Sequence, residues 1–239
     1  MPQTPLYQAA IERIVERAPD TRSFFLRLGA DQILRFRPGQ FLSFQLPGRG
    51  KTLTRAYTIT SNPEDNGLLE ICLNLVPDGP GSQYLFARRI GDRLSFSGPW
   101  GGFVFDRAPS AECVFIAEGT GIAAIRPMLR RALEGGLQQP LTLVYATAGE
   151  QDLLYREQLE GWARAHIAFS FRPLLVQPAA YWDGLQGDLL AHVEACYVKR
   201  DTDRSRHFYI CGIGQRVLQL RDLLRAAGYE RRAVKYEKW

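Results

Sequence analysis

Apolar and polar residues alternate along the first part of the chain. The clearest case is Leu69–Leu75, where leucine and isoleucine alternate with Glu70, Cys72 and Asn74. A period of two is typical of a strand with one buried face. Other short apolar runs lie at 23–28, 40–46, 56–60 and 93–97, separated by turn-forming pairs such as Pro38-Gly39 and Gly98-Pro99. Short strands at this spacing predict an antiparallel β-barrel, with one short helix at 82–89.

From about Cys113 the pattern changes to apolar strands that alternate with helices. The run Val114–Ala117 leads through Gly119-Thr120-Gly121 into a predicted helix over 122–133. Further strands are expected at 141–145, 168–175, 208–211 and 234–236, and further helices near 152–165, 187–196 and 216–227. This alternation predicts a parallel sheet covered by helices. We therefore expect two domains: an antiparallel β-barrel at 1–108, then an α/β domain with a parallel sheet at 109–239.

Composition narrows the class of protein. Of 239 residues, 46% are hydrophobic and 23% charged, which is typical of a globular protein. No apolar stretch approaches the length of a transmembrane helix, and the polar N-terminal residues do not form a signal pattern, so a cytoplasmic protein is expected. The net charge of +5 is spread over both halves without a basic stripe. We expect no nucleic-acid binding and a weak preference for acidic partners.

The four cysteines, Cys72, Cys113, Cys196 and Cys211, lie far apart in the sequence. None forms a CxxC pair, so the zinc, c-type haem and iron–sulfur motifs are absent. Widely spaced cysteines in a chain of this kind predict free thiols, and we expect no metal.

Two short motifs in the first half have two interpretations each. Arg55-Ala56-Tyr57-Thr58 opens an expected strand, and on its own it fits an exposed strand as well as a binding site. Gly79-Pro80-Gly81-Ser82 precedes the expected helix. A glycine-rich turn at that place offers backbone N–H groups to an anion. Alternatively, Ser82 is simply the N-cap of the helix.

The second half carries a stronger motif. Gly119-Thr120-Gly121-Ile122-Ala123-Ala124 matches G-x-G-x-x-G/A directly after an apolar strand and before a helix, the context of a dinucleotide-binding turn. The acidic ribose ligand expected at the tip of the next strand is missing, and Glu150 is the nearest candidate. Tyr209-Ile210-Cys211-Gly212 ends another strand at the edge where parallel sheets bind ligands, although a lone cysteine on a strand is more often a small buried apolar residue.

Taken in order, the segments RAYT, GPGSQYL, GPWGGF, GTGIAA, YICG and the final glutamate-x-aromatic resemble the ferredoxin–NADP⁺ reductase superfamily over essentially the whole chain. Several pieces are also similar to its cytochrome b5 reductase branch. The resemblance implies an FAD-dependent NAD(P)H oxidoreductase. Such an enzyme passes hydride from NADH or NADPH to flavin N5 and then electrons to a protein acceptor such as ferredoxin, flavodoxin, an oxygenase or a cytochrome. Two alternatives stay open: an NAD(P)H:flavin reductase that releases reduced flavin, and a non-catalytic FAD-binding subunit.

The resemblance also implies roles for individual residues. Arg55 would pair with the FAD pyrophosphate, Tyr57 would pack on the flavin, and Thr58 would place its hydroxyl near N5. The catalytic residues implied are Thr58, Cys211 and Glu237. Cofactor-binding residues implied are Arg55, Ala56, Tyr57, Thr58, Gly79, Gly81, Ser82 and Trp239 for FAD, and Gly119, Thr120, Gly121, Cys211 and Gly212 for the coenzyme. Trp239 would cover the flavin face that the nicotinamide must reach.

The chain departs from the family pattern at two places. Glu118 stands where the family usually has glycine, which puts a carboxylate beside the phosphate-binding loop. NADPH-using relatives carry a Ser-Arg pair after the third parallel strand, where this chain has Val176-Gln177 and no cation. This second departure predicts NADH as the preferred donor. Arg172 and Arg216 are the cations to consider for a 2′-phosphate, although Arg172 is expected inside the strand.

Overall fold

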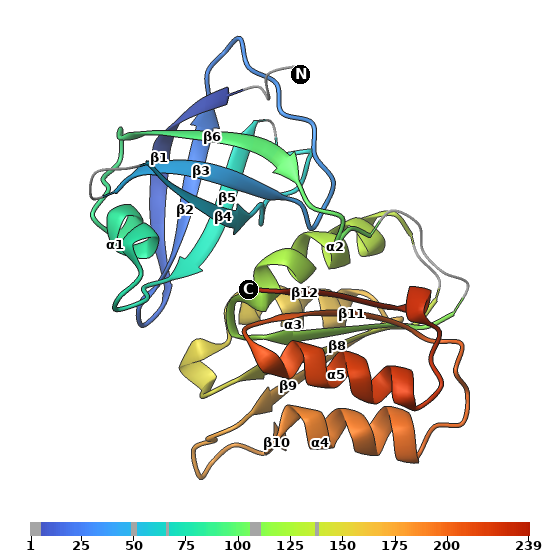
Figure 1. Cartoon of the computed structure of the whole chain (residues 1–239). Coiled ribbons are helices and arrows are strands. Elements are labelled where there is room, and N and C mark those ends of the chain that lie inside the picture. The colour runs from blue at the N-terminus through green and yellow to red at the C-terminus, as the bar shows by residue number, and fades with distance from the viewer. Residues whose placement is uncertain (1–5, 49–51, 66, 106–110, 137–138) are drawn as a thin grey trace. The chain divides into compact units, whose positions relative to one another are not determined.

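The computed structural model describes residues 6–48, 52–65, 67–105, 111–136 and 139–239. They form two compact units (Figure 1). The first comprises Met1–Asp106 with Arg126–Arg131, and the second comprises Arg107–Ile125 with Ala132–Trp239. The expected order of a β unit before an α/β unit is confirmed. The predicted boundary at 108/109 lies outside the described residues.

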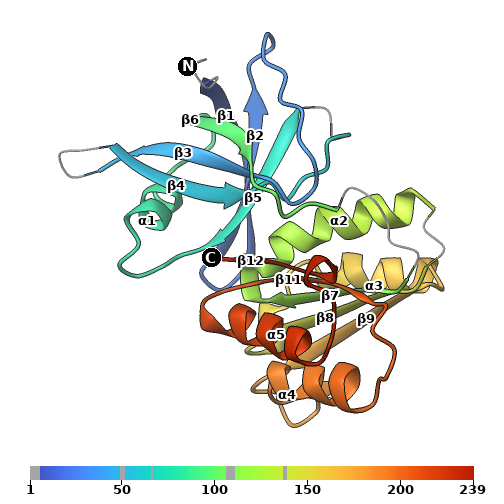
Figure 2. The same ribbon diagram turned by 45° about the vertical axis from the view of Figure 1, so that its right-hand side comes forward.

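The first unit is a curled antiparallel sheet. Its strands are β1 (Leu6–Ala18), β2 (Thr21–Leu28), β3 (Phe41–Pro47), β4 (Thr52–Thr58), β5 (Leu68–Asn74) and β6 (Arg93–Trp100), in the order β4-β3-β6-β1-β2-β5. A bridge between Ile59 and Ile71 joins the chain after β4 to β5. The Thr60 N–H also donates to the Glu70 carbonyl at 2.7 Å. The two edge strands therefore meet, and the sheet closes as the predicted barrel (Figure 2).

The barrel encloses an apolar core and carries one helix. Phe24, Phe44 and Phe96 are fully buried in that core. Helix α1 spans Pro80–Phe86 rather than the predicted 82–89. It begins earlier because Pro80 occupies the first turn, where a missing N–H costs nothing.

The second unit is a parallel sheet in the order β10-β9-β8-β7-β11-β12. Its strands are β7 (Cys113–Glu118), β8 (Leu141–Thr147), β9 (Phe169–Leu175), β10 (Leu185–Gln186), β11 (His207–Gly212) and β12 (Val234–Lys238). The α-helices are α2 (Ile122–Glu134), α3 (Arg156–Ala165), α4 (Leu189–Glu194) and α5 (Gln215–Ala226), and α4 continues as a π-helix over Ala195–Lys199. Short 3₁₀ turns lie at Gly119–Gly121, Glu150–Asp152 and Arg231–Ala233. The sheet is the predicted one, apart from the two-residue β10, which the sequence did not indicate.

Strand order fixes where this sheet can hold a ligand. From β7 the chain adds β8, β9 and β10 on one side, and β11 and β12 then follow on the other side of β7. Helices α2 and α3 lie on one face of the sheet, and α4 and α5 lie on the other (Figures 1 and 2). The order reverses between β7 and β11, and ligands of open α/β sheets bind beyond the carboxyl ends at such a switch point. Among the described residues, none of the helices is long and apolar enough to cross a membrane.

Candidate functional site

Arg55 lies on β4, an edge strand of the sheet that pairs with β3. Its side chain is exposed, and its Nη1 donates to the Thr54 carbonyl at 2.8 Å. Within the described part of the chain, no carboxylate pairs with this guanidinium. An exposed guanidinium without a carboxylate partner is suited to a diphosphate, whose paired oxygens match its two N–H edges.

Gly81 belongs to the Gly79–Ser82 motif, and it packs against side chains of the Arg55–Thr58 motif. A Cβ built on Gly81 would lie 2.7 Å from Arg55 Cγ and 2.9 Å from the Tyr57 hydroxyl oxygen, so a larger residue would displace these side chains. Tyr57 packs its ring edge-on against Phe44, with 5.7 Å between centroids. Burial raises the pKa of the Tyr57 phenol to about 12, so it stays protonated and can donate a hydrogen bond. Two segments separated by more than twenty residues thus form one surface.

Thr58 is the last residue of β4, and its side chain is buried. The residue is 4% exposed, and its Oγ1 is buried without a hydrogen-bond partner among the described residues. A buried hydroxyl left unpaired costs free energy, so a hydroxyl of this kind is suited to a hydrogen bond with a bound polar group. The exposed Arg55 guanidinium, the Gly81 contact and the Thr58 hydroxyl together fit the FAD that the resemblance implies.

Ser82 has a different local role from the one its sequence position suggests. The N-cap of α1 is Gly79, so the interpretation of Ser82 as N-cap is wrong. Its hydroxyl donates to the Gly79 carbonyl at 3.0 Å and accepts from the Val76 N–H at 3.0 Å, closing the turn before the helix. Because this side chain is already engaged, only backbone N–H groups of the first helical turn remain to meet an anion.

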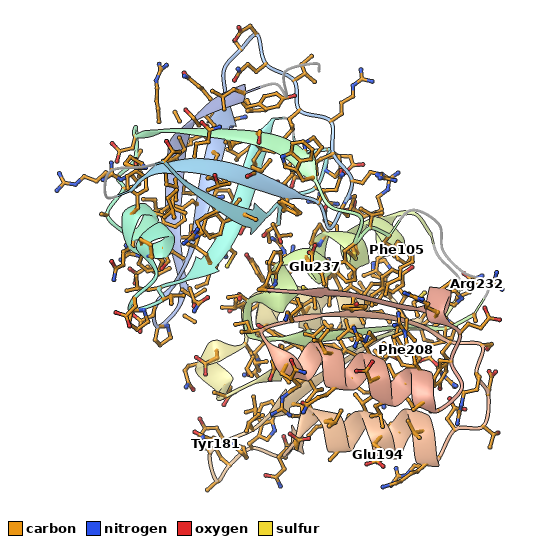
Figure 3. All side chains as sticks on the ribbon, viewed as in Figure 1. Phe105, Tyr181, Glu194, Phe208, Arg232 and Glu237 are labelled. Carbon is orange, nitrogen blue, oxygen red and sulfur yellow. The ribbon has the colours of Figure 1, made fainter. Side chains whose placement is uncertain are left out.

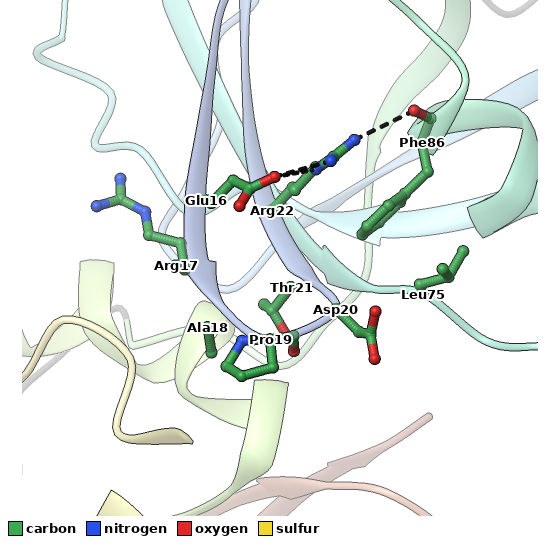
Figure 4. A pocket seen from close by; sticks show the side chains of 9 residues that line it. All are labelled: Glu16, Arg17, Ala18, Pro19, Asp20, Thr21, Arg22, Leu75 and Phe86. Atoms are coloured by element: carbon green, nitrogen blue, oxygen red, sulfur yellow. Dashed lines mark hydrogen bonds and ion pairs between the residues drawn. The ribbon is translucent and has the colours of Figure 1, made fainter. Parts of the chain in front are cut away.

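A cavity of about 580 Å³ lies elsewhere on the first unit, at the turn between β1 and β2 (Figure 4). The Arg22 guanidinium lies 4.7 Å from the centroid of the Phe86 ring and donates to the Phe86 carbonyl at 3.2 Å. None of the predicted flavin-binding residues lines this cavity. Its lining is Glu16, Arg17, Ala18, Pro19, Asp20, Thr21, Arg22, Leu75 and Phe86.

In the second unit the dinucleotide turn packs against the end of β11. A Cβ on Gly121 would lie 2.1 Å from the Cys211 carbonyl oxygen, and one on Gly212 would lie 3.0 Å from Glu118 Cβ. Gly119 has a φ of +53°, and no atom lies within 4 Å of a Cβ built there. Gly121 therefore permits close packing, whereas Gly119 leaves open space over the turn. Such open space beside a glycine backbone suits a dinucleotide phosphate.

Cys211 and Glu237 are neighbours across β11 and β12 in the parallel register. Figure 3 labels Glu237 on β12. Its Oε2 is buried with no partner among the described residues, and burial raises the pKa of the carboxyl to about 7. Burial and the nearby Glu237 also raise the pKa of the Cys211 thiol, so the thiol is neutral rather than a thiolate. The pair thus offers a neutral thiol beside a carboxyl that is poised to hold a proton near neutral pH.

Trp239 is the last residue of the sequence, and its backbone is fixed. Its N–H donates to the Gly212 carbonyl at 3.1 Å, and its own carbonyl accepts from the Gly214 N–H at 3.3 Å. The side chain is 38% exposed. These bonds hold the residue beside the Cys211-Gly212 strand end.

The structure adds an ion-pair triad that the sequence did not predict. Arg216 Nε lies 3.3 Å from Glu118 Oε1, and Arg216 Nη1 pairs with Asp188 Oδ2. The sequence drew attention to Glu118 and Arg216 separately, and nothing in it pointed to Asp188. Glu150, the nearest sequence candidate for a ribose ligand, pairs with Arg156.

Family comparison agrees with both units. Residues 8–105 match the oxidoreductase FAD-binding domain, and residues 115–219 match the oxidoreductase NAD-binding domain. The chain belongs to the ferredoxin–NADP⁺ reductase superfamily and is a flavin-dependent NAD(P)H reductase.

Two curated relatives illustrate the range of the family. The chain is 30% identical to ferredoxin–NADP reductase B of Sorangium cellulosum, covering all of both chains. It is 29% identical to the electron transfer component of toluate 1,2-dioxygenase from Pseudomonas putida, over 98% of this chain and 67% of that one. Among solved structures, a ferredoxin NADP⁺ reductase from Neisseria gonorrhoeae shares the fold with a TM-score of 0.85, 21% identity and 98% coverage of both chains.

Proposed function

We propose that this reductase takes hydride from NAD(P)H onto FAD and passes the electrons to a protein acceptor. The observation that carries the proposal is the buried, unpartnered hydroxyl of Thr58 at the end of the Arg55–Thr58 motif. When bound, FAD supplies a ring system that accepts hydride and releases electrons singly or in pairs. The protein binds and orients the FAD and the coenzyme, and it holds the proton.

In this proposal Arg55 holds the FAD diphosphate through charge-assisted hydrogen bonds. Gly81 lets the first turn of α1 approach the Arg55 and Tyr57 side chains. Tyr57 supports the flavin with its ring and donates from its phenol. The Thr58 hydroxyl fixes the reacting edge of the flavin, and Ala56, Gly79 and Ser82 contribute backbone groups.

The second unit binds the coenzyme in the proposal. Gly119, Thr120 and Gly121 form the turn against which the pyrophosphate lies, with Gly212 beside them. Cys211 and Glu237 line the nicotinamide pocket, where the thiol stays neutral and the carboxyl can gain or lose its proton near neutral pH. Trp239 occupies the nicotinamide's place until the coenzyme enters.

The acceptor we propose is a protein with an acidic face, such as ferredoxin, flavodoxin or an oxygenase component, acting in the cytoplasm. The net charge of +5 supports an acidic partner, because charge complementarity accelerates electron-transfer encounters. Two relatives are named as a ferredoxin–NADP reductase and as the electron transfer component of a dioxygenase, which supports a protein electron acceptor of this kind.

The test is purification followed by gel filtration and turnover. FAD that stays bound through gel filtration supports an electron-transfer reductase and contradicts a flavin reductase that releases its flavin. Steady-state NADH oxidation with ferricyanide as acceptor contradicts a non-catalytic FAD-binding subunit. A protein that cannot take up FAD overturns the proposal.

A further inference from the structure

We propose that Arg126 is a positioning residue for flavin reduction: its guanidinium fixes the backbone that follows Thr58 and thereby holds the Thr58 hydroxyl in place. Arg126 acts through Thr58 and not on the flavin or the coenzyme itself. The inference rests on the proposed function, because it assigns Arg126 to that same hydride transfer.

Thr58 is the last residue that β4 holds in its ladder with β3. Its Oγ1 has no hydrogen-bond partner among the described residues, so the backbone alone sets the position of the hydroxyl. Beyond Thr58, the Ile59 N–H donates to the Gln40 carbonyl at 2.9 Å, and the Thr60 N–H donates to the Glu70 carbonyl at 2.7 Å. Thr60 is 1% exposed, and a buried carbonyl requires a donor from the protein.

Arg126 supplies that donor from helix α2. Its Nη1 donates to the Thr60 carbonyl at 3.2 Å and to Glu70 Oε2 at 2.8 Å. The helical segment Arg126–Arg131 belongs to the first unit, together with Thr60 and Glu70. Glu70 therefore holds Thr60 directly through its backbone carbonyl and, through Arg126, by its carboxylate. Both backbone polar groups of Thr60, two residues after Thr58, are fixed in this way.

Glu70 is a firm anchor for this guanidinium. Its side chain is 3% exposed, and its Oε1 accepts from the Ser23 hydroxyl at 2.7 Å and from Arg17 Nη2 at 3.1 Å. Burial opposes ionisation of Glu70, but Arg126, the Ser23 hydroxyl and Arg17 outweigh it and lower the pKa of the carboxyl. Glu70 is thus a charged carboxylate bound at both oxygens. It keeps Arg17 and Ser23 as partners when Arg126 is replaced, so such a variant does not leave a bare buried charge.

Removal of the Arg126 guanidinium leaves the buried Thr60 carbonyl without this donor. Because an unsatisfied buried carbonyl is costly, the Thr60 peptide must turn toward another donor. That movement changes the direction of the Thr58 hydroxyl, which no other side chain among the described residues restrains by a hydrogen bond. A small misplacement of a group at the reacting centre is enough to slow a reaction.

The experiment combines Arg126→Met with Thr58→Val in a double-mutant cycle on the FAD-loaded protein. Methionine keeps an apolar stem and removes the donors. Arg131→Met is the matched control, because Arg131 lies on the same helix and pairs with the exposed Glu64 at 2.6 Å. Rapid anaerobic mixing with NADH gives the rate of flavin reduction. The visible absorption band of the bound oxidised flavin is the second readout, since hydrogen bonds to the ring tune its electronic properties.

Arg126→Met is expected to slow flavin reduction about three- to tenfold, while the FAD content and the KM for NADH stay within about twofold of the wild type. In the Thr58→Val background the same substitution changes the rate by less than about twofold, because its effect passes through the missing hydroxyl. Arg126→Met and Thr58→Val shift the flavin band in the same direction, and Arg131→Met leaves both rate and band unchanged. Arg126→Lys restores most of the rate, since it keeps a cationic donor beside Glu70.

A second variant, Glu70→Gln, decides the question where Arg126→Met does not fold. It loosens the hold on the guanidinium without removing the donor, and it should slow reduction at least about twofold with Thr58 and not with Thr58→Val. A wild-type rate and an unshifted band in the folded variant overturn the inference. An equal loss of rate with and without the Thr58 hydroxyl overturns it as well.

The failure of this inference is distinguishable from that of the proposed function. If neither NADH nor NADPH reduces the bound flavin of the wild type, the proposed function fails. If the wild type is reduced and Thr58→Val slows it while Arg126→Met does not, only the role of Arg126 fails.

Discussion

Cys211 and Glu237 stand next to each other on the parallel strands β11 and β12, and burial together with the Glu237 charge raises the pKa of the Cys211 thiol. The Glu237 carboxyl, with one oxygen buried and unpartnered, has a pKa raised to about 7. A carboxyl that binds its proton more tightly when folded makes stability depend on pH in a defined direction, which gives the first prediction.

Glu237 contributes stability that is fully present below its ordinary pKa of 4.5 and is lost as the pH rises through about 7. The Glu237→Gln variant cannot ionise, so its unfolding temperature should exceed that of the wild type increasingly between about pH 5 and pH 8. The difference in unfolding free energy should grow by about 1–3 kcal/mol over that range. Thermal unfolding across this range measures it. Glu230→Gln, at an exposed glutamate just before β12, should show no such trend, and parallel curves for wild type and Glu237→Gln would contradict the buried-carboxyl account.

Arg55→Ala should weaken FAD binding. Losing a charge-assisted contact to the diphosphate costs about 1.5–3 kcal/mol, which corresponds to a roughly ten- to hundredfold higher Kd. Titration of FAD into the flavin-free protein, monitored by flavin fluorescence, gives the Kd of the wild type and that of the Arg55→Ala variant. The control is Arg93→Ala at the exposed start of β6, which removes the same charge without touching the motif. Equal FAD affinity in the two variants would remove Arg55 from the site.

Thr58→Val should slow flavin reduction while the FAD content stays near normal. Valine keeps the shape of threonine but loses the hydroxyl, and one hydrogen bond to the reacting edge of the flavin is worth about 1 kcal/mol or more, hence about five- to tenfold in rate. Rapid mixing with NADH under anaerobic conditions measures the rate. Thr58→Ser should restore most of it. A valine variant that reacts at the wild-type rate would make Thr58 structural only.

Gly121→Ala should destabilise the second unit, because the new Cβ would lie 2.1 Å from the Cys211 carbonyl oxygen. Overpacking against backbone costs about 1–3 kcal/mol or more. Urea unfolding followed by circular dichroism detects the loss. Gly161→Ala, inside α3 with its nearest neighbour atom 4.0 Å away, should be neutral or stabilising by up to about 1 kcal/mol. Equal effects at both glycines would show that the turn does not pack closely on β11.

The sequence predicted the fold class because hydrophobic periodicity separates the two units, but it did not predict β1. In that strand only Ala9 and Ile11 are buried, and register shifts after Ile11 and Glu16 interrupt the alternation. Strand β4 was predicted at 56–60 but spans Thr52–Thr58. Only Thr58 of β4 is buried, so this edge strand has no apolar pattern to reveal it.

The candidate site, too, could be predicted from the sequence only in part. The order of motifs pointed to the candidate site residues, and the structure packs Gly81 on Arg55 and Gly121 on Cys211. The roles of these residues in binding stay predictions. The ion-pair triad of Glu118, Arg216 and Asp188 could not be predicted from the sequence, because Asp188 and Arg216 are 28 residues apart and meet through the sheet topology. The engagement of the Ser82 hydroxyl within its own turn was likewise invisible in the sequence.

The central claim is that the chain binds FAD and reduces it with a nicotinamide coenzyme. The most direct measurement mixes the FAD-loaded protein anaerobically with NADH, and in parallel with NADPH, while the absorbance of the bound flavin is recorded. We predict that the flavin band bleaches, faster with NADH, and returns when ferricyanide is added. A protein that does not take up FAD, or a bound FAD that stays oxidised with both coenzymes, would contradict the account.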